Sequence, residues 1–573
     1  MGVIWLGGCA RNCAFPDIHA SGLHRQASST IGARNPPLKP STGSTWYILQ
    51  KMFKILTPLF LLVFIPNDLL GQIHQFDGQH MNDRLGWSVS GAGDVNGDGI
   101  PDFIVGALYA NNGLASGSAY VYSGANGTLL YQFDGQNSAD RFGESVSAAG
   151  DVNGDGYDDL IVGADGSDNG GSSSGSAYIY SGVNGALLYQ WDGQKPADRF
   201  GGIVSGAGDV NNDGYDDVIV GADGVDNNGG NSGAAFVYSG ANAALLYQFD
   251  GQNADDHLGR SVSGAGDLNG DGFDDVFIGA DGADNNGSNS GSAYVYSGAN
   301  GTLLYRFDGQ NPGDTLGGSV SRAGDVNSDG FEDLIVGAFR SDNNGFESGS
   351  AYVYSGANGA LLYQWDGENS SDHFGWSVSG AGDVNGNGHD DVIVGANNSS
   401  NNGVGSGSAY VYSGAHGSLL YQWDGQSSSD RFGGSVSGAG DVNGDGFDDV
   451  IVGADSSDAF RFDSGTAYVY SVSAKYSITP MTAGSPATFT IIGAAPNSSV
   501  TLGYSLSGAG PFTTVFGVAA MTPPINTLTI LSSNANGDAS WTVNVPGSVS
   551  GSTLYTQGLN AGFLTNALAE SIN

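Results

Sequence analysis

One nine-residue segment, DVNGDGFDD in its last copy, recurs seven times and constrains the fold more than any other feature of this chain. Its copies follow one another at intervals of 57 or 58 residues. They begin at Asp94, Asp151, Asp209, Asp267, Asp325, Asp383 and Asp441. A fixed period of this length indicates an array of supersecondary units, each of which buries its faces only against its neighbours. The 573 residues therefore need not be divided among several unrelated domains.

Each repeat holds four short segments with strand character. In the second unit these segments are residues 142–150, 159–164, 175–181 and 186–192, rich in β-branched and aromatic side chains and separated by Gly, Asn and Asp. Four short strands per unit are typical of a propeller blade. The sequence therefore predicts an all-β fold, a seven-bladed β-propeller over residues 72–472.

The two ends of the array predict how the ring closes. The seventh unit stops after its third strand segment, Ser464–Ser471, and lacks the fourth. A matching segment, Ile73–Gly78, precedes the first unit instead. We expect this N-terminal strand to complete the last blade, because an unpaired sheet edge would otherwise remain exposed.

The repeated segment itself predicts a metal site. It places oxygen-bearing side chains at positions 1, 3, 5 and 9 around a Gly at position 6, and such carboxylates repel one another unless a cation lies between them. Hard oxygen donors in loose geometry favour Ca²⁺, up to seven ions, over Mg²⁺. The predicted ligands, which include the residue at position 7, are Asp94, Asn96, Asp98, Ile100, Asp102, Asp151, Asn153, Asp155, Tyr157, Asp159, Asp209, Asn211, Asp213, Tyr215, Asp217, Asp267, Asn269, Asp271, Phe273, Asp275, Asp325, Asn327, Asp329, Phe331, Asp333, Asp383, Asn385, Asn387, His389, Asp391, Asp441, Asn443, Asp445, Phe447 and Asp449.

Two other interpretations of the segment compete with a calcium loop between strands. An EF-hand loop begins in the same way, but it needs a Glu at position 12, where this chain has Val or Ile, and it needs flanking helices. An empty Asp/Gly turn is the second alternative. It does not explain why position 9 is Asp in all seven copies.

Charge and cysteine content bear on compartment and partners. From residue 72 onward there are 11 basic and 56 acidic residues, a surface that repels nucleic acid and anionic membranes. Both cysteines, Cys9 and Cys13, precede the repeats. A short basic segment and an apolar run within residues 52–71 resemble a secretory signal peptide, so residues 1–71 are interpreted as an N-terminal extension plus signal. We expect a secreted or cell-surface protein.

Variable positions are the candidate ligand contacts. Aromatic residues shared by every unit, such as Trp191 and Tyr178, are interpreted as packing between blades. The loops between the second and third strands differ from unit to unit, and a specific ligand must break sevenfold symmetry. Large side chains stand out in these loops at Leu108, Tyr109, Phe339, Arg340, Phe460 and Arg461.

The repeats end near residue 472. Residues 473–573 contain few acids and several alternating apolar runs, which predict a small β-sandwich of about seven strands.

These features resemble those of FG-GAP repeat proteins, whose best-known members are the N-terminal propellers of integrin α chains. The FG pair occurs as Phe142-Gly143, Phe200-Gly201, Phe374-Gly375 and Phe432-Gly433, with Leu-Gly in the other units, and Gly163-Ala164 is an example of the GA pair. The resemblance implies Ca²⁺ on the hairpins between strands 1 and 2, and ligand contacts on the opposite face, from the 2–3 and 4–1 loops. Integrin α propellers usually carry fewer calcium loops, whereas all seven units here carry one, so the resemblance does not imply an integrin-type β partner.

No catalytic set is found in the sequence. Four histidines, His257, His373, His389 and His416, have no nucleophile beside them, and the single G-x-S-x-G match at residues 171–175 lies in a Gly/Ser-rich loop. We therefore expect a monomeric adhesion or ligand-binding protein that recognises a protein or glycan, without nucleic acid and without a membrane span. The alternatives are a structural matrix or surface-layer protein and, as a weaker hypothesis, an enzyme acting on polysaccharide or lipid.

Overall fold

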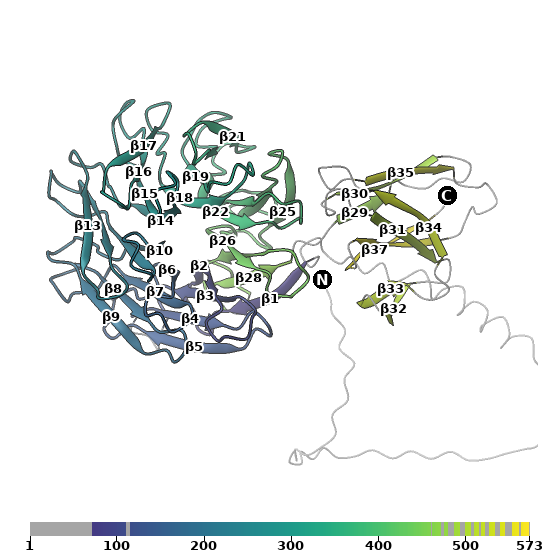
Figure 1. The fold of residues 1–573 in the computed structure, drawn as a ribbon, viewed down its shortest axis with the longest axis horizontal. Coiled ribbons are helices and arrows are strands. Elements are labelled where there is room, and N and C mark those ends of the chain that lie inside the picture. The colour runs from purple at the N-terminus through teal and green to yellow at the C-terminus, as the bar shows by residue number, and fades with distance from the viewer. Residues whose placement is uncertain are drawn as a thin grey trace, which may run out of the picture. The chain divides into compact units, whose positions relative to one another are not determined.

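The computed structural model describes residues 71–110, 115–459 and 461–471, together with nine strands between Lys475 and Ser571. In the first three ranges, 28 strands form seven four-stranded antiparallel sheets arranged around a ring (Figure 1). Within the described part of the chain the structure is all-β. The predicted seven-bladed propeller is confirmed.

The innermost strand of each blade faces the centre of the ring, and the second strand pairs with it. The innermost strands are β2 (Leu85–Gly93), β6 (Val146–Gly150), β10 (Ile203–Gly208), β14 (Ser261–Gly266), β18 (Ser319–Gly324), β22 (Phe374–Gly382) and β26 (Ser435–Gly440). The second strands are β3 (Asp102–Ala107), β7 (Asp159–Ala164), β11 (Asp217–Ala222), β15 (Asp275–Ala280), β19 (Asp333–Ala338), β23 (Asp391–Ala396) and β27 (Asp449–Ala454).

The third and fourth strands form the outer half of each blade. The third strands are β4 (Ser118–Tyr122), β8 (Ser176–Tyr180), β12 (Ala234–Tyr238), β16 (Ser292–Tyr296), β20 (Ser350–Tyr354), β24 (Ser408–Tyr412) and β28 (Thr466–Tyr470). The fourth strands are β5 (Leu129–Asp134), β9 (Leu187–Asp192), β13 (Leu245–Asp250), β17 (Leu303–Asp308), β21 (Leu361–Asp366), β25 (Leu419–Asp424) and β1 (Gln72–Asp77).

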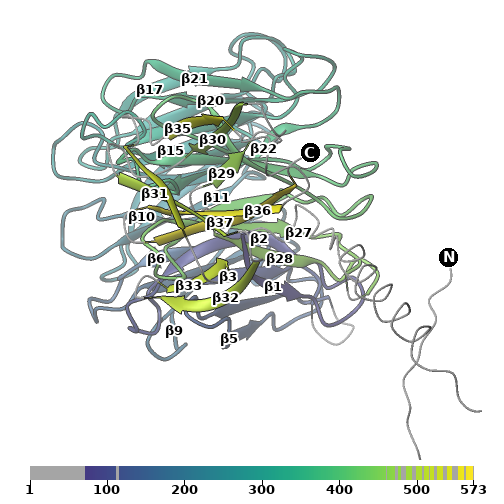
Figure 2. The ribbon, with the colours of Figure 1, turned by 90° about the vertical axis from the view of Figure 1, so that its right-hand side faces the viewer.

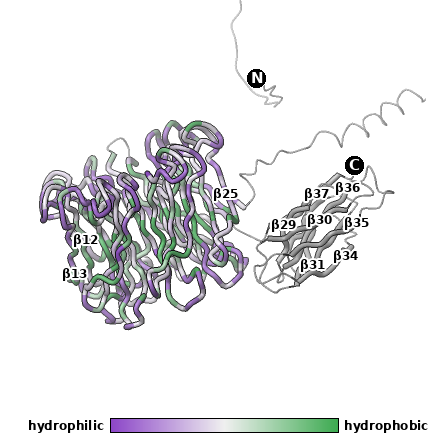
Figure 3. The backbone as a smooth tube through the Cα atoms, turned by 90° about the horizontal axis from the view of Figure 1, so that it is seen from above, coloured by the Kyte–Doolittle hydropathy of each residue, from purple (hydrophilic) through white to green (hydrophobic). Residues whose placement is uncertain are grey.

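The core lies between blades and is centred on the second strands. Every residue of β7, for example, is buried, because neighbouring blades cover both faces of the strand. In β9 the first residue is exposed and none is fully buried, as expected for an outer edge. Figure 3 shows the same pattern, with hydrophobic residues along the strands and hydrophilic residues in the loops at both ends.

The ring closes through the N-terminal strand, as predicted. Strand β1 pairs with β28 in the sheet that also contains β27 and β26, and the two strands lie together in Figures 1 and 2. Thr466 Oγ1 donates a hydrogen bond of 3.1 Å to Asp77 Oδ1. A parallel bridge between Leu85 and Gly465 joins the first blade to the last. No unpaired third-strand edge therefore remains in the seventh blade.

Glycine allows the close contact between neighbouring blades at the FG and GA motifs. Gly143 has a φ of +86°, and its N–H donates to Gly163 O at 2.9 Å within its own blade. A Cβ added to Gly106 of the preceding blade would lie 2.1 Å from Gly143 O. Any side chain at Gly106 would therefore push the two blades apart.

The shared aromatic residues pack between blades, which confirms that interpretation. Trp191 on β9 stacks on Tyr238 of the next blade, with ring centroids 4.6 Å apart. Phe133 on β5 stacks in the same way on Tyr180, at 4.0 Å. These contacts recur around the ring, so the aromatic positions serve the fold.

The nine strands between Lys475 and Ser571 form three sheets. A three-stranded sheet has the order β29-β30-β35, a four-stranded sheet has the order β34-β31-β36-β37, and β32 pairs with β33. Their bounds are β29 (Lys475–Ile478), β30 (Pro486–Ile492), β31 (Ser499–Ser505), β32 (Ala509–Thr514), β33 (Gly517–Met521), β34 (Asn526–Ser532), β35 (Ala539–Asn544), β36 (Thr553–Asn560) and β37 (Phe563–Ser571). Whether the sheets pack as the predicted sandwich stays a prediction.

Three predictions concern residues outside the described ranges. They are the signal peptide within residues 52–71, the pair Cys9 and Cys13, and the ligand candidate Phe460. Among the described residues, no helix has the length and apolar character needed to cross a membrane.

Candidate metal centres and the opposite face

The seven predicted calcium loops connect the first and second strands of each blade, at one face of the ring. The Asp at position 1 organises each loop by accepting main-chain hydrogen bonds. In the second blade, Asp151 Oδ1 accepts from Asp155 N at 3.0 Å and Oδ2 accepts from Gly156 N at 2.9 Å. The same two bonds occur in all seven loops. The loop is therefore preformed around an anionic side chain.

Positions 5 and 9 complete the loop from its other side. The Asp155 carboxylate accepts a hydrogen bond from Tyr157 N at 3.1 Å. The Asp159 side chain is fully buried and accepts from Gly182 N at 2.9 Å and from Asn153 Nδ2 at 2.9 Å. Position 9 thus ties the loop to the turn that follows the third strand of its own blade.

The position-9 carboxyls sit in unusual surroundings for acids. Burial, followed by the nearby charges of the Asp residues at positions 5 and 1, raises the pKa of Asp159 to about 7. The same causes raise the pKa of Asp102 to about 6 and that of Asp449 to about 8. In Asp391 burial also raises the pKa. A nearby cation would reverse this effect by favouring the ionised form.

The carboxylates of each loop are not arranged as a coordination sphere. Within the described ranges, no group of three or more His, Cys, Asp or Glu side chains is close enough to hold a metal ion. The physical reason is that the carboxylates of each loop accept hydrogen bonds from local N–H groups. The sequence-predicted ligands are therefore brought into one loop, but not into one coordination sphere.

The residues present nevertheless fit Ca²⁺. The donor set consists of hard oxygen atoms, which Ca²⁺ prefers. Asn385, at position 3 of the sixth loop, is 2% exposed, and its Oδ1 has no hydrogen-bond partner, while its Nδ2 donates to Asp391 Oδ2 at 2.7 Å. An orphaned amide oxygen at a predicted ligand position is what a missing cation would leave.

Neighbouring loops are joined through position 8, which the sequence reasoning overlooked. The Asp216 carboxylate accepts a hydrogen bond of 2.8 Å from Asp151 N, the first residue of the preceding loop. The same bond joins four other pairs of loops. The signal was available, because position 8 is acidic in six of the seven copies.

Two junctions depart from this arrangement. In the first loop position 8 is Pro101, which has no carboxylate to accept a hydrogen bond from the seventh loop. In the fifth loop position 8 is Glu332, whose Oε2 is buried without a hydrogen-bond partner. Neighbouring loops are therefore joined by this hydrogen bond at five junctions and not at the other two.

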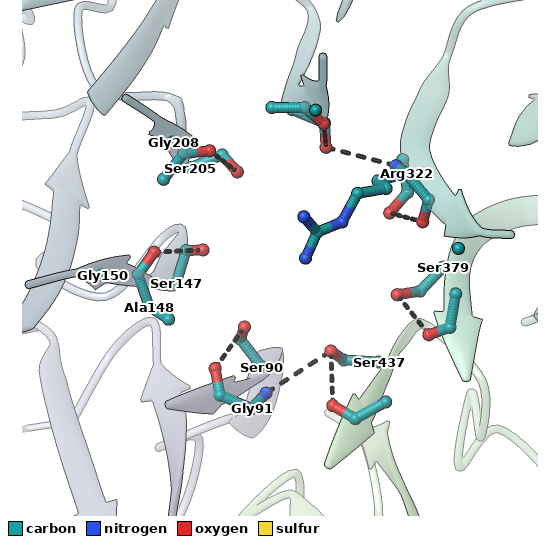
Figure 4. A pocket seen from close by; sticks show the side chains of 18 of the residues that line it. Ser90, Gly91, Ser147, Ala148, Gly150, Ser205, Gly208, Arg322, Ser379 and Ser437 are labelled. Atoms are coloured by element: carbon teal, nitrogen blue, oxygen red, sulfur yellow. Dashed lines mark hydrogen bonds between the residues drawn. The ribbon is translucent and has the colours of Figure 1, made fainter. Parts of the chain in front are cut away.

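The innermost strands surround a channel of about 570 Å³ (Figure 4). Its wall carries a serine from each blade, and Ser90 Oγ, for example, donates to Gly91 O at 2.8 Å. The residue after the serine is Gly or Ala in six blades and Arg322 in the fifth. The Arg322 guanidinium extends into the channel, with its Nε 3.8 Å from Glu332 Oε2.

On the opposite face, the aspartate two residues before each FG or LG pair, which is present in every unit, forms a turn, as expected. Asp140 Oδ2 accepts from Asn137 N at 2.7 Å, and the equivalent bond occurs in every blade. Asp140 is 5% exposed, so it is not a ligand contact.

The predicted ligand contacts on this face divide into buried and accessible residues. Leu108 is 2% exposed and belongs to the core, so its prediction as a ligand contact was wrong. Tyr109 lies partly exposed under the Arg84 guanidinium, 5.4 Å from the ring centroid. Arg461 is exposed.

A second accessible group lies on the fifth and sixth blades. The ring of Phe339 meets Trp376 edge-on, with centroids 4.8 Å apart, and Arg340 lies over Phe339 at 5.3 Å. Arg340 Nε is 3.9 Å from Glu347 Oε1.

Sequence reasoning missed the residue that follows each FG or LG pair. It is Trp87 in the first blade, Glu144 in the second, Arg260 in the fourth and Trp376 in the sixth, while the others have Gly. The signal was its variation inside an otherwise repeated motif. This position therefore adds to the surface that differs between blades.

Comparison with known proteins places the repeats. The FG-GAP repeat family matches residues 85–122, 142–180, 200–238, 258–296, 317–354, 374–412 and 432–470. The chain is 35% identical to integrin alpha-V of Gallus gallus over 217 residues, which are 35% of this chain and 20% of that protein. It is 30% identical to integrin alpha-5 of Xenopus laevis over 233 residues, or 37% of this chain and 21% of that protein. It is also 30% identical to integrin alpha-4 of Xenopus laevis over 246 residues, which are 40% of this chain and 23% of that protein. The chain thus spans about a fifth of the length of these relatives.

Proposed function

The chain belongs to the FG-GAP repeat family, and on that premise we propose that it is an extracellular, calcium-binding adhesion or ligand-binding protein. In this proposal one face of the propeller holds calcium and the opposite face recognises a protein or glycan. The observation that carries the proposal is the contrast between seven nearly identical acidic loops and an opposite face that differs from blade to blade.

The residues proposed to hold Ca²⁺ are the side chains at positions 1, 3, 5 and 9 of each loop. A bound Ca²⁺ supplies positive charge between carboxylates that otherwise repel one another. The chain's own residues prepare the site, because main-chain N–H groups already orient the position-1 carboxylate and burial fixes the position-9 carboxylate. Secretion is consistent with this proposal, since extracellular calcium modules bind at about 10⁻⁴–10⁻³ M.

The residues proposed to contact a ligand are Tyr109, Phe339, Arg340 and Phe460, with Trp376 added from the structure. Aromatic and arginine side chains are enriched among residues that dominate binding energy. Trp376 is 36% exposed and meets the ring of Phe339 edge-on, and the Arg340 guanidinium lies over that ring. Two aromatic side chains and a cation therefore lie together at the surface. The protein is proposed to act as a monomer.

A binding screen tests the proposal. The full chain is applied to a glycan array and to an extracellular-protein pull-down, in Ca²⁺ and in chelator. We expect calcium-dependent binding that the combined substitutions Tyr109→Ala, Phe339→Ala and Arg340→Ala weaken at least tenfold without lowering the melting temperature. Leu187→Ala, on the outer edge where Leu187 is 49% exposed, is the matched control. Absence of binding in both screens, or equal loss in the control, would overturn the proposal.

A further inference from the structure

Three of the few cations in this acidic propeller line one pocket. Arg141, Arg199 and Arg260 come from the 4–1 loops that lead into the second, third and fourth blades. The pocket has a volume of about 380 Å³, within the range of small-ligand sites. From residue 72 onward the sequence has 11 basic residues against 56 acidic ones. The presence of three arginines in one pocket therefore sets it apart from the rest of the surface.

The arginines are only partly neutralised by the acids beside them. Arg141 is paired with Asp165, with Nη1 3.1 Å from Oδ2. Arg199 and Arg260 flank Asp223 from two sides at 3.6 and 3.7 Å, which is too long for a hydrogen bond.

Their donor groups are also underused. Within the described ranges, no hydrogen bond from the guanidinium of Arg199 or Arg260 is found. A guanidinium has five N–H donors, so these two groups retain donors for another oxyanion.

Glu144 adds an unsatisfied group to the same pocket. The residue is partly exposed, but its Oε2 is buried and has no hydrogen-bond partner in the described structure. Burial, followed by the charge of Asp165, raises the pKa of Glu144, although the guanidinium groups of Arg141 and Arg260 act in the opposite direction. The raised pKa favours the protonated carboxyl, the form that can donate a hydrogen bond.

The charge count of the pocket lining follows from these groups. Three guanidinium groups line the pocket beside three acidic side chains, Glu144, Asp165 and Asp223. The lining therefore has as many basic as acidic side chains, in contrast to the strongly negative chain. Asp281 lies just outside, 3.9 Å from Arg260 Nε.

We propose that this pocket binds one compact oxyanion, a carboxylate or a sulfate, on an otherwise uncharged ligand. Arg199 and Arg260 donate to the anion, and Glu144, which also lines the pocket, contributes a further donor when it is protonated. A polyanion is excluded because the surrounding acidic surface repels any additional negative charge. This inference rests on the proposed ligand-binding function and gives it a chemical class.

Matched probes test the inference on the full chain in Ca²⁺. One probe is a trisaccharide whose only charged group is a terminal glucuronate, compared with the same trisaccharide ending in glucose. A second trisaccharide carries a single 6-sulfate as its only charge, and a third probe is a peptide whose only charged side chain is one glutamate, compared with its glutamine version. Calorimetry should show binding of at least one anionic probe about tenfold tighter than its neutral counterpart, which corresponds to one charge-assisted hydrogen bond.

Substitutions locate the binding. Arg199→Gln and Arg260→Gln should each weaken the preferred anionic probe about tenfold, with unchanged melting temperatures. Arg431→Gln is the matched control, because Arg431 occupies the same repeat position as Arg199 in the seventh blade, outside this pocket. Glu144→Ala should weaken binding, whereas Glu144→Gln, which keeps a donor, should retain it within about twofold.

The outcomes separate this inference from the proposed function. Equal affinity for anionic and neutral probes, or no effect of Arg199→Gln and Arg260→Gln, overturns the anion pocket. In that case, calcium-dependent binding in the screen that is still lost with Phe339→Ala and Arg340→Ala leaves the proposed function standing. Loss of all binding in every assay overturns both.

Discussion

On the face of the hairpins between strands 1 and 2, the seven blades carry nearly the same residues, and on the opposite face they do not. Position 9 of the loop is Asp in every blade, fully buried, with the same hydrogen-bond partners in most of them. The residue after the FG or LG pair ranges instead from Gly202 to Glu144, Arg260 and Trp376. The same strands join both faces, yet most of the variation between blades lies on one of them. The repeated face is constrained by stability, and the varied face is free to serve recognition.

Removing calcium should have the largest effect, because it acts on the repeated loops of all seven blades. At about 1 mM Ca²⁺ and a dissociation constant of about 10⁻⁴ M, each proposed site would stabilise the folded state by about 1.4 kcal/mol, so seven such sites would contribute about 10 kcal/mol. Calorimetry in chelator should show a large fall in melting temperature, which Mg²⁺ restores only slightly. An unchanged melting curve, or fewer than about five bound Ca²⁺ per chain, would contradict the assignment.

A single substitution on each face sharpens the contrast. Asp159→Ala removes one proposed calcium ligand and leaves the Gly182 N–H buried without its acceptor, so we expect a loss of about 2–4 kcal/mol in the free energy of unfolding. Arg340→Ala on the opposite face removes an exposed ion pair and the cation–π contact with Phe339, and should cost about 1 kcal/mol or less. Denaturant unfolding in Ca²⁺ measures both. Similar losses in the two variants would show that the faces do not differ in this way.

The pH dependence of the calcium-free protein should follow from the position-9 carboxyls. Their pKa values are raised in the folded state, to about 6 in Asp333 and about 7 in Asp217 and Asp275, chiefly by burial. A raised folded-state pKa contributes stability that is present below the unfolded value and lost as the pH rises through the folded value. The melting temperature in chelator should therefore fall between pH 5 and pH 8.

Calcium should remove this fall, because the ionised carboxylates are its proposed ligands. A melting temperature in chelator that rises over the same pH range would show that these carboxyls do not control it.

The smallest expected effect concerns the one loop with an amide at position 5. Asn387 Oδ1 accepts from His389 N at 2.9 Å, as the aspartates do in the other loops, but it carries no charge. Asn387→Asp should tighten the sixth site several-fold, by about 1 kcal/mol or less, as measured by calcium titration. The control is Asn385→Ala, which removes the orphaned oxygen and should weaken the same site. Unchanged affinity in both variants would place the sixth ion elsewhere.

Much of the fold could be predicted because it is repeated. A period of 57 or 58 residues and four strand segments per unit were enough to predict seven blades, and the missing last strand predicted the pairing of β1 with β28. The predicted strand Asp159–Ala164 coincides with β7, since its apolar run is bounded by a loop on each side.

The sites were less predictable, because they depend on contacts between units. Leu108 and Tyr109 are adjacent in the sequence, yet one is buried and the other is accessible, and only the packing of the first blade decides which. Similarly, the acidic residue at position 8 repeats visibly in the sequence, but its hydrogen-bond partner lies 65 residues away, as in the pair Asp151 and Asp216, and is identified only by the packing of neighbouring loops. The three arginines of the anion pocket come from three different blades for the same reason.

The closure of the ring has a consequence for the order of folding. Thr466 and Asp77, joined across β28 and β1, are separated by 389 residues, so this ladder depends on nearly the whole array being present. Loop-closure entropy must be overcome before such distant contacts contribute, which makes them late and slow to form. Six blades are assembled from contiguous segments and can form independently of this step. We therefore expect the seventh blade to be completed last. Until β1 pairs with β28, the edge of β28 is exposed and can pair with a strand of another chain. Dilution during refolding should favour pairing with β1 of the same chain.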